Sequence, residues 1–323
     1  MARKRLELSN ALTFEESLGF SVFETSNHRP RSEHKDTPYV HRLIHMDVRS
    51  RGRGGAVARG RPRRYSDLAI ETALTLRLVF HLPLRQTEGF VNSLFSMMGL
   101  ALSAPDHTTL SRRGQCLKPR LRPVPTGGGI HLVLDSSGLS IVGEGEWAAA
   151  KYGGRRGRRG WKKIHLGVDG SGVILSHALT DATVDDATTG QDLIDAVEGD
   201  LVSVIADAAY DTVALYDAAG ARGAKVVVPP ARTANVSRRG PRSRARDRTI
   251  TNVQEIGRRQ WKKESGYHRQ ARGENAFFRY KSIIGPGLGA RSPAGQRSEA
   301  VLACRILNRM TDLGRPESYP IGR

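Results

Sequence analysis

The sequence predicts an α/β catalytic fold that follows an all-helical segment, and three observations support this prediction. Beyond residue 130, short apolar runs of strand length alternate with helical patterns, as expected for a mixed sheet flanked by helices. Between residues 66 and 121 the apolar spacing is helical throughout. The proline- and glycine-rich stretch 122–129 separates the two patterns and marks a domain boundary.

Residues 1–64 are expected to form a basic arm without stable structure of its own. The stretch 49–64 holds seven arginines and no acidic residue. Such a segment is able to follow the phosphate backbone of DNA.

Residues 65–121 are expected to form a small helical domain. Ser66 and Asp67 cap the first helix, the second helix ends at Gly99, and Asp106 begins the third. Short helices with Arg112 and Arg113 exposed on the last one are typical of a helix-turn-helix domain that binds DNA. A plain helical bundle is the alternative.

Residues 130–318 are expected to form the α/β domain, with a mixed sheet of five strands. The strands are predicted at 130–134, 163–168, 173–179, 201–206 and 225–228. Helices are predicted at 185–198, 210–219, 253–264, 268–283 and 294–313. An arginine-rich insert at 231–249 separates the last strand from the helices that follow it.

The charge balance indicates a polyanionic partner. Lys and Arg number 51 against 32 Asp and Glu, which gives a net charge of +19. Nucleic acid is the most common partner of such a chain, although a general arginine bias in the genome would produce the same composition. Two cysteines exclude a disulfide framework, and the chain contains neither a nucleotide-binding P-loop motif nor an apolar run that could span a membrane. We expect no membrane association, no nucleotide cofactor and a cytoplasmic location.

Two aspartates, Asp135 and Asp207, each follow an apolar strand. Strand ends of this kind meet at one edge of an open α/β sheet, so we expect the two carboxylates to face each other. Two close carboxylates repel unless a cation lies between them, and hard oxygen ligands favour Mg²⁺ or Mn²⁺. Asp211 is a rival ligand, but its position predicts a helix cap instead.

A third carboxylate is predicted on the helix that covers 268–283. Tyr267, Glu274 and Lys281 are seven residues apart, about two helical turns, and would share one stripe. Each acid taken alone is more simply explained as a solvated surface residue. The combination of two strand-end aspartates, a helical glutamate and a strongly basic chain favours a site with two metal ions that acts on phosphodiesters.

At these motifs the sequence resembles bacterial insertion-sequence transposases of the DDE type, in the large family with a Tyr-Arg-Glu-Lys signature (the insertion-sequence-five type). The resemblance covers about residues 60–318, leaves residues 1–55 out, and rests on five segments: DSSGLSIVGEGEW, RRGWKKIHLGVD, IADAAYDT, SGYHRQARGENAFFRYKS and ILNRMTDLGRPES.

The resemblance implies an RNase H-like catalytic core that is interrupted by an insertion before the helix of the catalytic glutamate. It also implies that Asp135, Asp207 and Glu274 form the DDE triad and hold two Mg²⁺ or Mn²⁺ ions. Tyr267 and Lys281 match the signature, whereas its arginine corresponds to Gln270.

Several further residues are candidates for contacts with DNA. Arg269 and Arg272 are the nearest substitutes for the missing arginine. Residues 151–163 hold seven basic residues, including Lys162 and Lys163, and Trp161 could stack on bases. A hairpin tip beside an ordinary core tryptophan explains Trp161 equally well.

The activity expected is a DNA transposase that binds terminal inverted repeats of double-stranded DNA, frees a 3′-OH by hydrolysis and joins it to target DNA. Two DNA ends must meet, so the resemblance implies a homodimer on DNA, associated with the bacterial nucleoid. A repurposed, non-enzymatic DNA-binding regulator and an RNase H-like nuclease without strand transfer remain alternatives.

Overall fold

The computed structural model describes residues 64–121, 128–142, 160–237, 240 and 243–314. The chain divides into two units, residues 1–72 and 73–323. Of the first unit, residues 64–72 are described. They begin helix α3, which Ser66 caps by accepting a hydrogen bond from the N–H of Ala69. The basic arm predicted for 1–64 lies outside the described residues, except for Arg64.

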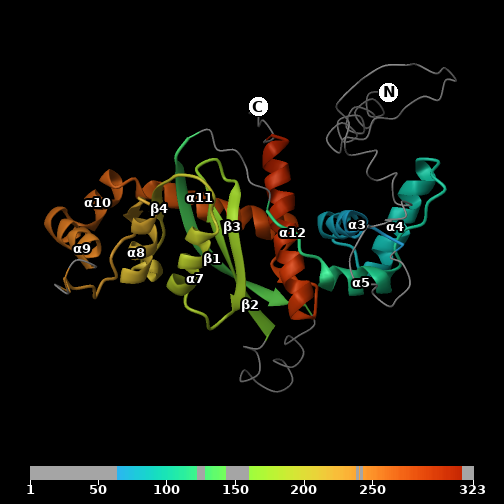
Figure 1. Cartoon of the computed structure of the whole chain (residues 1–323), viewed down its shortest axis with the longest axis horizontal. Coiled ribbons are helices and arrows are strands. Elements are labelled where there is room, and N and C mark those ends of the chain that lie inside the picture. Colours follow the sequence, from blue (N-terminus) through green and yellow to red (C-terminus); the bar gives the residue numbers. More distant parts are fainter. Residues whose placement is uncertain (1–63, 122–127, 143–159, 238–239, 241–242, 315–323) are drawn as a thin grey trace, which may run out of the picture. The chain divides into compact units, whose positions relative to one another are not determined.

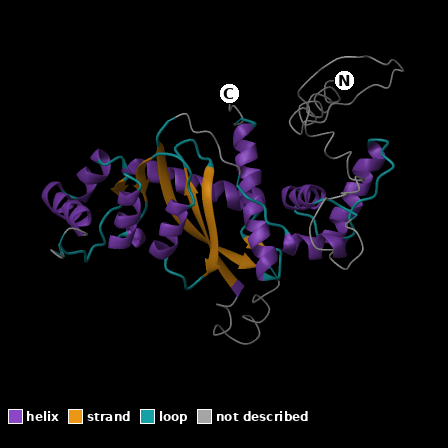
Figure 2. Cartoon of the chain, in the orientation of Figure 1, coloured by secondary structure: helices purple, strands orange, loops and turns teal. Residues whose placement is uncertain are grey.

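The second unit contains one sheet with helices around it (Figures 1 and 2). Within the described residues, three helices precede the sheet: α3 (Asp67–Val79), which begins in the first unit, α4 (Leu84–Met97) and α5 (His107–Cys116). The strands are β1 (Ile130–Ile141), β2 (Trp161–Val168), β3 (Ile174–Asp181), β4 (Leu201–Ile205), β5 (Lys225–Val227) and β6 (Gly287–Leu288). The later helices are α7 (Asp186–Asp195), η3 (Ala208–Tyr210), α8 (Val213–Ala221), α9 (Arg244–Ile256), α10 (Arg258–Glu264), η5 (Tyr267–Gln270), α11 (Ala271–Arg279), η6 (Tyr280–Ile284) and α12 (Pro293–Asp312).

The sheet has the order β3-β2-β1-β4-β5, and β6 pairs with β1. Strand β2 pairs antiparallel with both β1 and β3. Strands β4 and β6 pair parallel with β1, and β5 pairs parallel with β4. This mixed sheet flanked by helices is consistent with an RNase H-like fold. The expectation of five strands was one short within the described residues, because the two-residue strand β6 has no apolar run that sequence could reveal.

Strand β1 also runs further than expected. It was predicted to end before Asp135, but it continues to Ile141 through the polar stretch Ser136–Ser140. Pairing explains the extension: β2 lies along this stretch, and the N–H of Ser140 donates to the carbonyl of Pro286 beside β6. Asp135 therefore lies within the sheet and not at the end of a strand.

The two faces of the sheet carry different apolar clusters. Leu132 and Leu134 of β1 pack against α7 and α8, whereas Val133 of the same strand packs with Trp261 of α10. Alternation of side chains along β1 thus directs odd-numbered residues toward the side of α10 and even-numbered residues toward α7 and α8. Figure 1 shows α9 and α10 beside α8.

Helix α12 fastens the start of strand β3. Asn308 accepts a hydrogen bond from the Ile174 N–H (2.8 Å) and donates one to the Ile174 carbonyl (2.7 Å), and all three groups are buried. We expect Asn308→Ala to lower the free energy of unfolding by about 2–3 kcal/mol, because two buried backbone groups lose their partner. Urea titration of the full chain measures this effect. The exposed Asn235→Ala is the control, and equal midpoints for the two variants would contradict the prediction.

Candidate active site

The register of the sheet brings two aspartates to the same level of adjacent strands. Val133 of β1 lies opposite Ile205 of β4, and Asp135 and Asp207 each stand two residues further along. Since side chains alternate along a strand, Asp135 projects from the face that carries Val133. Asp207 lies just beyond the end of β4, where its side chain caps η3 by accepting the N–H of Ala209. The Ser136 N–H donates to Asp135, at 2.8 Å.

A glycine lets the third carboxylate approach the other two. A methyl group at Gly273 of α11 would lie 3.1 Å from Cβ of Asp135 and 3.2 Å from Cγ1 of Val133, so the helix rests directly on β1. Glu274, the next residue, is exposed. Its charge acts on Asp135, since it contributes to the raised pKa of that carboxyl.

Burial and neighbouring negative charges raise the pKa values of the two aspartates. The pKa of Asp135 is raised to about 6, first by burial and then by the charges of Asp207, Glu274 and Asp186. Burial also raises the pKa of Asp207. The pKa of the Tyr267 hydroxyl is raised by burial and by the charges of Asp207, Glu274 and Asp135, so one phenol senses all three acids.

The carboxylates of Asp135, Asp207 and Glu274 are chemically suited to bind a hard divalent cation, although their oxygens do not converge on one metal position in this structure. Among the residues that the structure describes, no three His, Cys, Asp or Glu side chains converge closely enough to hold a metal ion. The three acids nevertheless come from facing elements, and carboxylate oxygens are the ligands that Mg²⁺ and Mn²⁺ prefer. Rotation of exposed side chains such as that of Glu274 changes their mutual distances without moving the backbone.

Sequence reasoning missed a fourth acid near this group. Asp186, in the first turn of α7, accepts a hydrogen bond from Nζ of Lys163 (3.0 Å) and lies 3.6 Å from Nδ1 of the buried His165. Its charge raises the pKa of both Asp135 and Asp207. No motif marks Asp186 in the sequence, because only the folding of α7 onto β2 brings it here.

Asp211 does not cap the start of α8, contrary to the prediction, and its carboxylate is bound to an arginine. Thr212 caps α8, whereas Asp211 forms two hydrogen bonds of 2.8 Å with the guanidinium of Arg246 and accepts the N–H of Ala231. The Asp211 side chain is 1% exposed. This pair joins the loop after β4 to α9 of the insert, so Arg246 is not available to follow DNA phosphates.

The segment from Tyr267 to Lys281 is not the single α-helix that was expected. Tyr267 lies in the 3-10 turn η5, Glu274 lies in α11, and Lys281 lies in the π-helical turn η6. A regular two-turn stripe therefore does not connect the three residues. Nζ of Lys262 lies 4.5 Å from the centre of the Tyr267 ring, and Lys281 is exposed.

The residues proposed to replace the signature arginine point away from one another. Gln270 is buried, and its side-chain N–H donates to the carbonyl of Leu134 at 3.4 Å. The guanidinium of Arg269 lies 3.5 Å from His131, near the start of β1 and remote from Asp135. Arg272 is exposed on α11, two residues and hence about 200° around the helix from Glu274.

Strand β2 carries three more candidates for DNA contact. Trp161 is 50% exposed and its ring covers Gly138, where a methyl group would lie 3.2 Å away. Lys162 forms an ion pair with Asp181, and Lys163 forms one with Asp186. The predicted basic tract at 151–159 lies outside the described residues.

Helix α5 carries Arg112, which is exposed, and Arg113, which is half-buried. Asp106 caps this helix as predicted and accepts the N–H groups of Thr108 and Thr109. Residues 98–106 connect α4 to α5, which is longer than the three- or four-residue turn of a helix-turn-helix. On its other side α5 adjoins α12, where the Ser298 hydroxyl donates to the Leu117 carbonyl.

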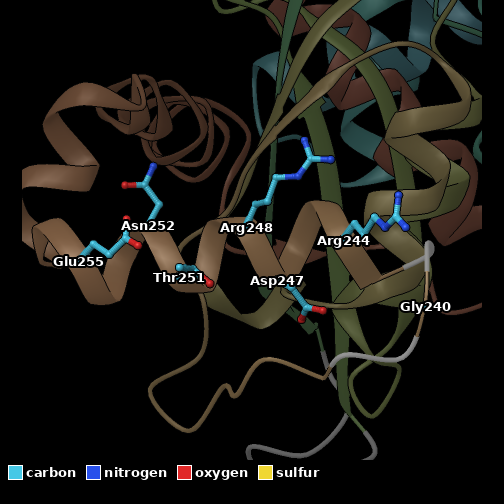
Figure 3. A pocket seen from close by; sticks show the side chains of 7 residues that line it. All are labelled: Gly240, Arg244, Asp247, Arg248, Thr251, Asn252 and Glu255. Atoms are coloured by element: carbon cyan, nitrogen blue, oxygen red, sulfur yellow. The ribbon is translucent and has the colours of Figure 1, made fainter.

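Helix α9 borders a surface hollow of about 710 Å³. Figure 3 shows Arg244, Arg248 and Asn252 projecting from one side of α9 and Asp247 from the other. The lining also includes Gly240, Thr251 and Glu255. Its lining carries two arginines and two acids, and it includes neither Asp135, Asp207 nor Glu274, so the hollow is separate from the candidate active site.

The close contact at Gly273 predicts a specific effect on activity. Gly273→Ala would push α11 a few tenths of an ångström away from β1, and we expect the rate of DNA cleavage to fall about tenfold through misplacement of Glu274. Gly89→Ala, in open space on α4, is the matched control and should leave the rate unchanged. Cleavage of radiolabelled DNA under single-turnover conditions measures both variants. Equal rates would show that the spacing between α11 and β1 is irrelevant to activity.

Within the described residues, the helices are too short or too polar to cross a membrane.

A family model described as the transposase DDE domain matches residues 126–309, more than half of the chain, and a second model with the same description matches residues 45–144. The second match begins inside the segment 1–55, which sequence analysis had left outside the family, so that boundary was too late. Enzymes of this family act on DNA and generally use divalent metal ions. The chain belongs to the insertion-sequence transposases with a DDE domain.

Proposed function

We propose that this chain binds the terminal inverted repeats of its own element, cuts a phosphodiester to free a 3′-OH, and joins that 3′-OH to target DNA. The observation that supports the proposal is that the charges of Asp135, Asp207 and Glu274 all act on the hydroxyl of Tyr267, so the three acids lie in one region of the fold. Asp135 lies in β1, Asp207 follows the end of the adjacent strand β4, and Gly273 of α11 lies against Asp135.

These three carboxylates would hold two Mg²⁺ or Mn²⁺ ions. Bound ions would activate the attacking oxygen and stabilise the charge of the leaving oxygen. The protein's own part is to align the scissile phosphate with the attacking group and to keep the carboxylates in place. Gly273 and the β1–β4 register serve this alignment.

The chemistry consists of two displacements at phosphorus. In the first, water attacks the phosphodiester, the P–O3′ bond breaks, and a 3′-OH is released. In the second, this 3′-OH attacks a phosphodiester of the target, so one P–O bond forms as another breaks. The number of phosphodiester bonds is conserved in the second step, and no nucleotide cofactor is therefore required.

DNA contacts are proposed from several parts of the chain. The cut end of the DNA would be contacted by Tyr267, Lys281, Arg272 and Trp161. The terminal repeat would be contacted by the helical domain 65–121 through Arg112 and Arg113. Lys162 and Lys163 would leave their ion pairs with Asp181 and Asp186 to contact DNA phosphates. Arg269 would contact DNA near His131, which its guanidinium approaches in this structure. A homodimer would hold two ends together, in the cytoplasm on nucleoid DNA.

One assay tests the function and its alternatives. The protein is incubated with Mg²⁺ and a duplex that carries the inverted repeats bordering its reading frame. Joined products would support transposition. Nicks without joining would indicate a nuclease, and a gel shift without cleavage would indicate the DNA-binding regulator that the neutral, buried Gln270 favours.

A further inference from the structure

Phe278 is a large apolar residue on α11 that the fold leaves in solvent. Its side chain is 70% exposed, whereas that of its neighbour Phe277 is 7% exposed. Helix α11 buries Gly273, Ala276 and Phe277 against the sheet. Burying an aromatic ring stabilises a fold by removing apolar surface from water, and the exposed ring of Phe278 contributes little of that free energy. Stability of the fold therefore does not explain a phenylalanine at position 278.

The position of Phe278 relative to Glu274 is informative. The two residues are four apart on the same α-helix, so they lie on one flank, about 6 Å apart along the helix axis. Successive nucleotides of a DNA strand are about 3.4 Å apart along the duplex. Two such steps span a similar length, so the ring at position 278 lies within about two nucleotides of a phosphate bound through cations beside Glu274.

The surroundings of Phe278 suit a nucleic acid. Lys281, three residues later, is exposed, and the chain carries a net charge of +19. Proteins hold unpaired bases with exposed aromatic rings that stack on the base and with cations that contact the phosphates. The occupant favoured by charge complementarity is thus DNA and not a second protein surface.

We propose that Phe278 stacks on an unpaired base within about two nucleotides of the phosphodiester that is cut, and so fixes the DNA end beside Glu274. This inference rests on the proposed function and adds which part of the substrate the helix holds. Phe278 positions the DNA and takes no part in the chemistry itself.

A thermodynamic cycle between side chain and base tests the proposal. Duplexes carrying the terminal repeat are prepared with a single abasic nucleotide at each of the two positions on either side of the cut. Affinity is measured by gel shift in Ca²⁺, so that binding is read without cleavage. For the wild type we expect one abasic position to weaken binding by about 5- to 150-fold.

Phe278→Ala should weaken binding to intact DNA by a similar factor, and the abasic nucleotide should then have no further effect. Phe278→Trp should retain affinity, and Phe278→Leu should lose it, because stacking requires a ring. Leu313→Ala is the control, since Leu313 is an apolar side chain that is 49% exposed at the end of α12, outside the residues proposed to contact DNA. Its affinity should equal that of the wild type.

Two results would overturn the proposal. In one, Phe278→Ala and the abasic nucleotide weaken binding independently, so that their effects multiply. In the other, Phe278→Ala changes the sedimentation of the free protein and leaves DNA affinity unchanged, which would assign the ring to contact between two copies. Failure of the proposed function would give a different result. A wild-type protein that binds the duplex in Ca²⁺ but does not cut it in Mg²⁺ would contradict the proposed cleavage, and the binding measurements on Phe278 would still test the stacking.

Discussion

Replacement of Asp135 by asparagine is expected to abolish DNA cleavage, by a factor of at least about 10³, while DNA binding persists. Asparagine has nearly the same shape but lacks the charge with which, in the proposed function, Asp135 would bind a divalent ion. The side chain accepts the N–H of Ser136, and the amide oxygen preserves that hydrogen bond. The expected loss is therefore chemical and not structural.

The measurement is single-turnover cleavage of the terminal-repeat duplex in Mg²⁺, paired with a gel shift of the same duplex. Asp192→Asn, an exposed acid on α7, removes the same charge at a distance and serves as the control. Removal of one negative charge should leave DNA affinity equal or slightly higher. Cleavage within tenfold of the wild-type rate would remove Asp135 from the catalytic group.

Loss of the ion pair between Arg246 and Asp211 is expected to have the largest effect on stability. The pair is bidentate, with two hydrogen bonds of 2.8 Å, and the carboxylate is almost wholly buried. Arg246→Ala leaves that charge without its partner, so we expect the free energy of unfolding to fall by about 3–5 kcal/mol. Urea titration followed by circular dichroism measures the change.

Arg244→Ala, an exposed arginine of the same helix, should change stability by no more than about 0.5 kcal/mol. The double variant Asp211→Leu with Arg246→Met should recover much of the loss, since no unpaired charge is then buried. A double variant as unstable as the sum of both single changes would mean that α9 is held by packing and that the pair is incidental.

Elements with local signals were predictable from sequence. The hairpin between β2 and β3, the cap of α5 at Asp106 and the long helix α12 all follow from apolar spacing and turn residues near in the chain. The aspartates were found because strand-like runs precede both of them. The extension of β1 through Ser136 and Gly138 was not predictable, because it depends on pairing with β2 and, at its end, with β6, which is far away in sequence.

The remainder of the site depends on contacts that no local pattern encodes. Asp186 joins the acids only because α7 folds over β2, and Asp211 is withdrawn from them by an arginine 35 residues later. The helix predicted at 253–264 is two helices, α9 and α10, which break at Gly257 where φ is +81°. In each case the deciding partner is tertiary.

The late pairing of the sheet has a consequence for synthesis. The N–H groups of Ser140 and Val142 donate to Pro286 and Leu288, and the outer side of β3 is fastened by Asn308. A ribosome adds about 5–20 residues per second, so a nascent chain carries these strands for roughly 7–29 s before their partners emerge. Unpaired strand edges are templates for association with other chains. Polypeptides cut short before residue 286 should therefore accumulate in inclusion bodies or be degraded, and chaperones should matter most during that interval.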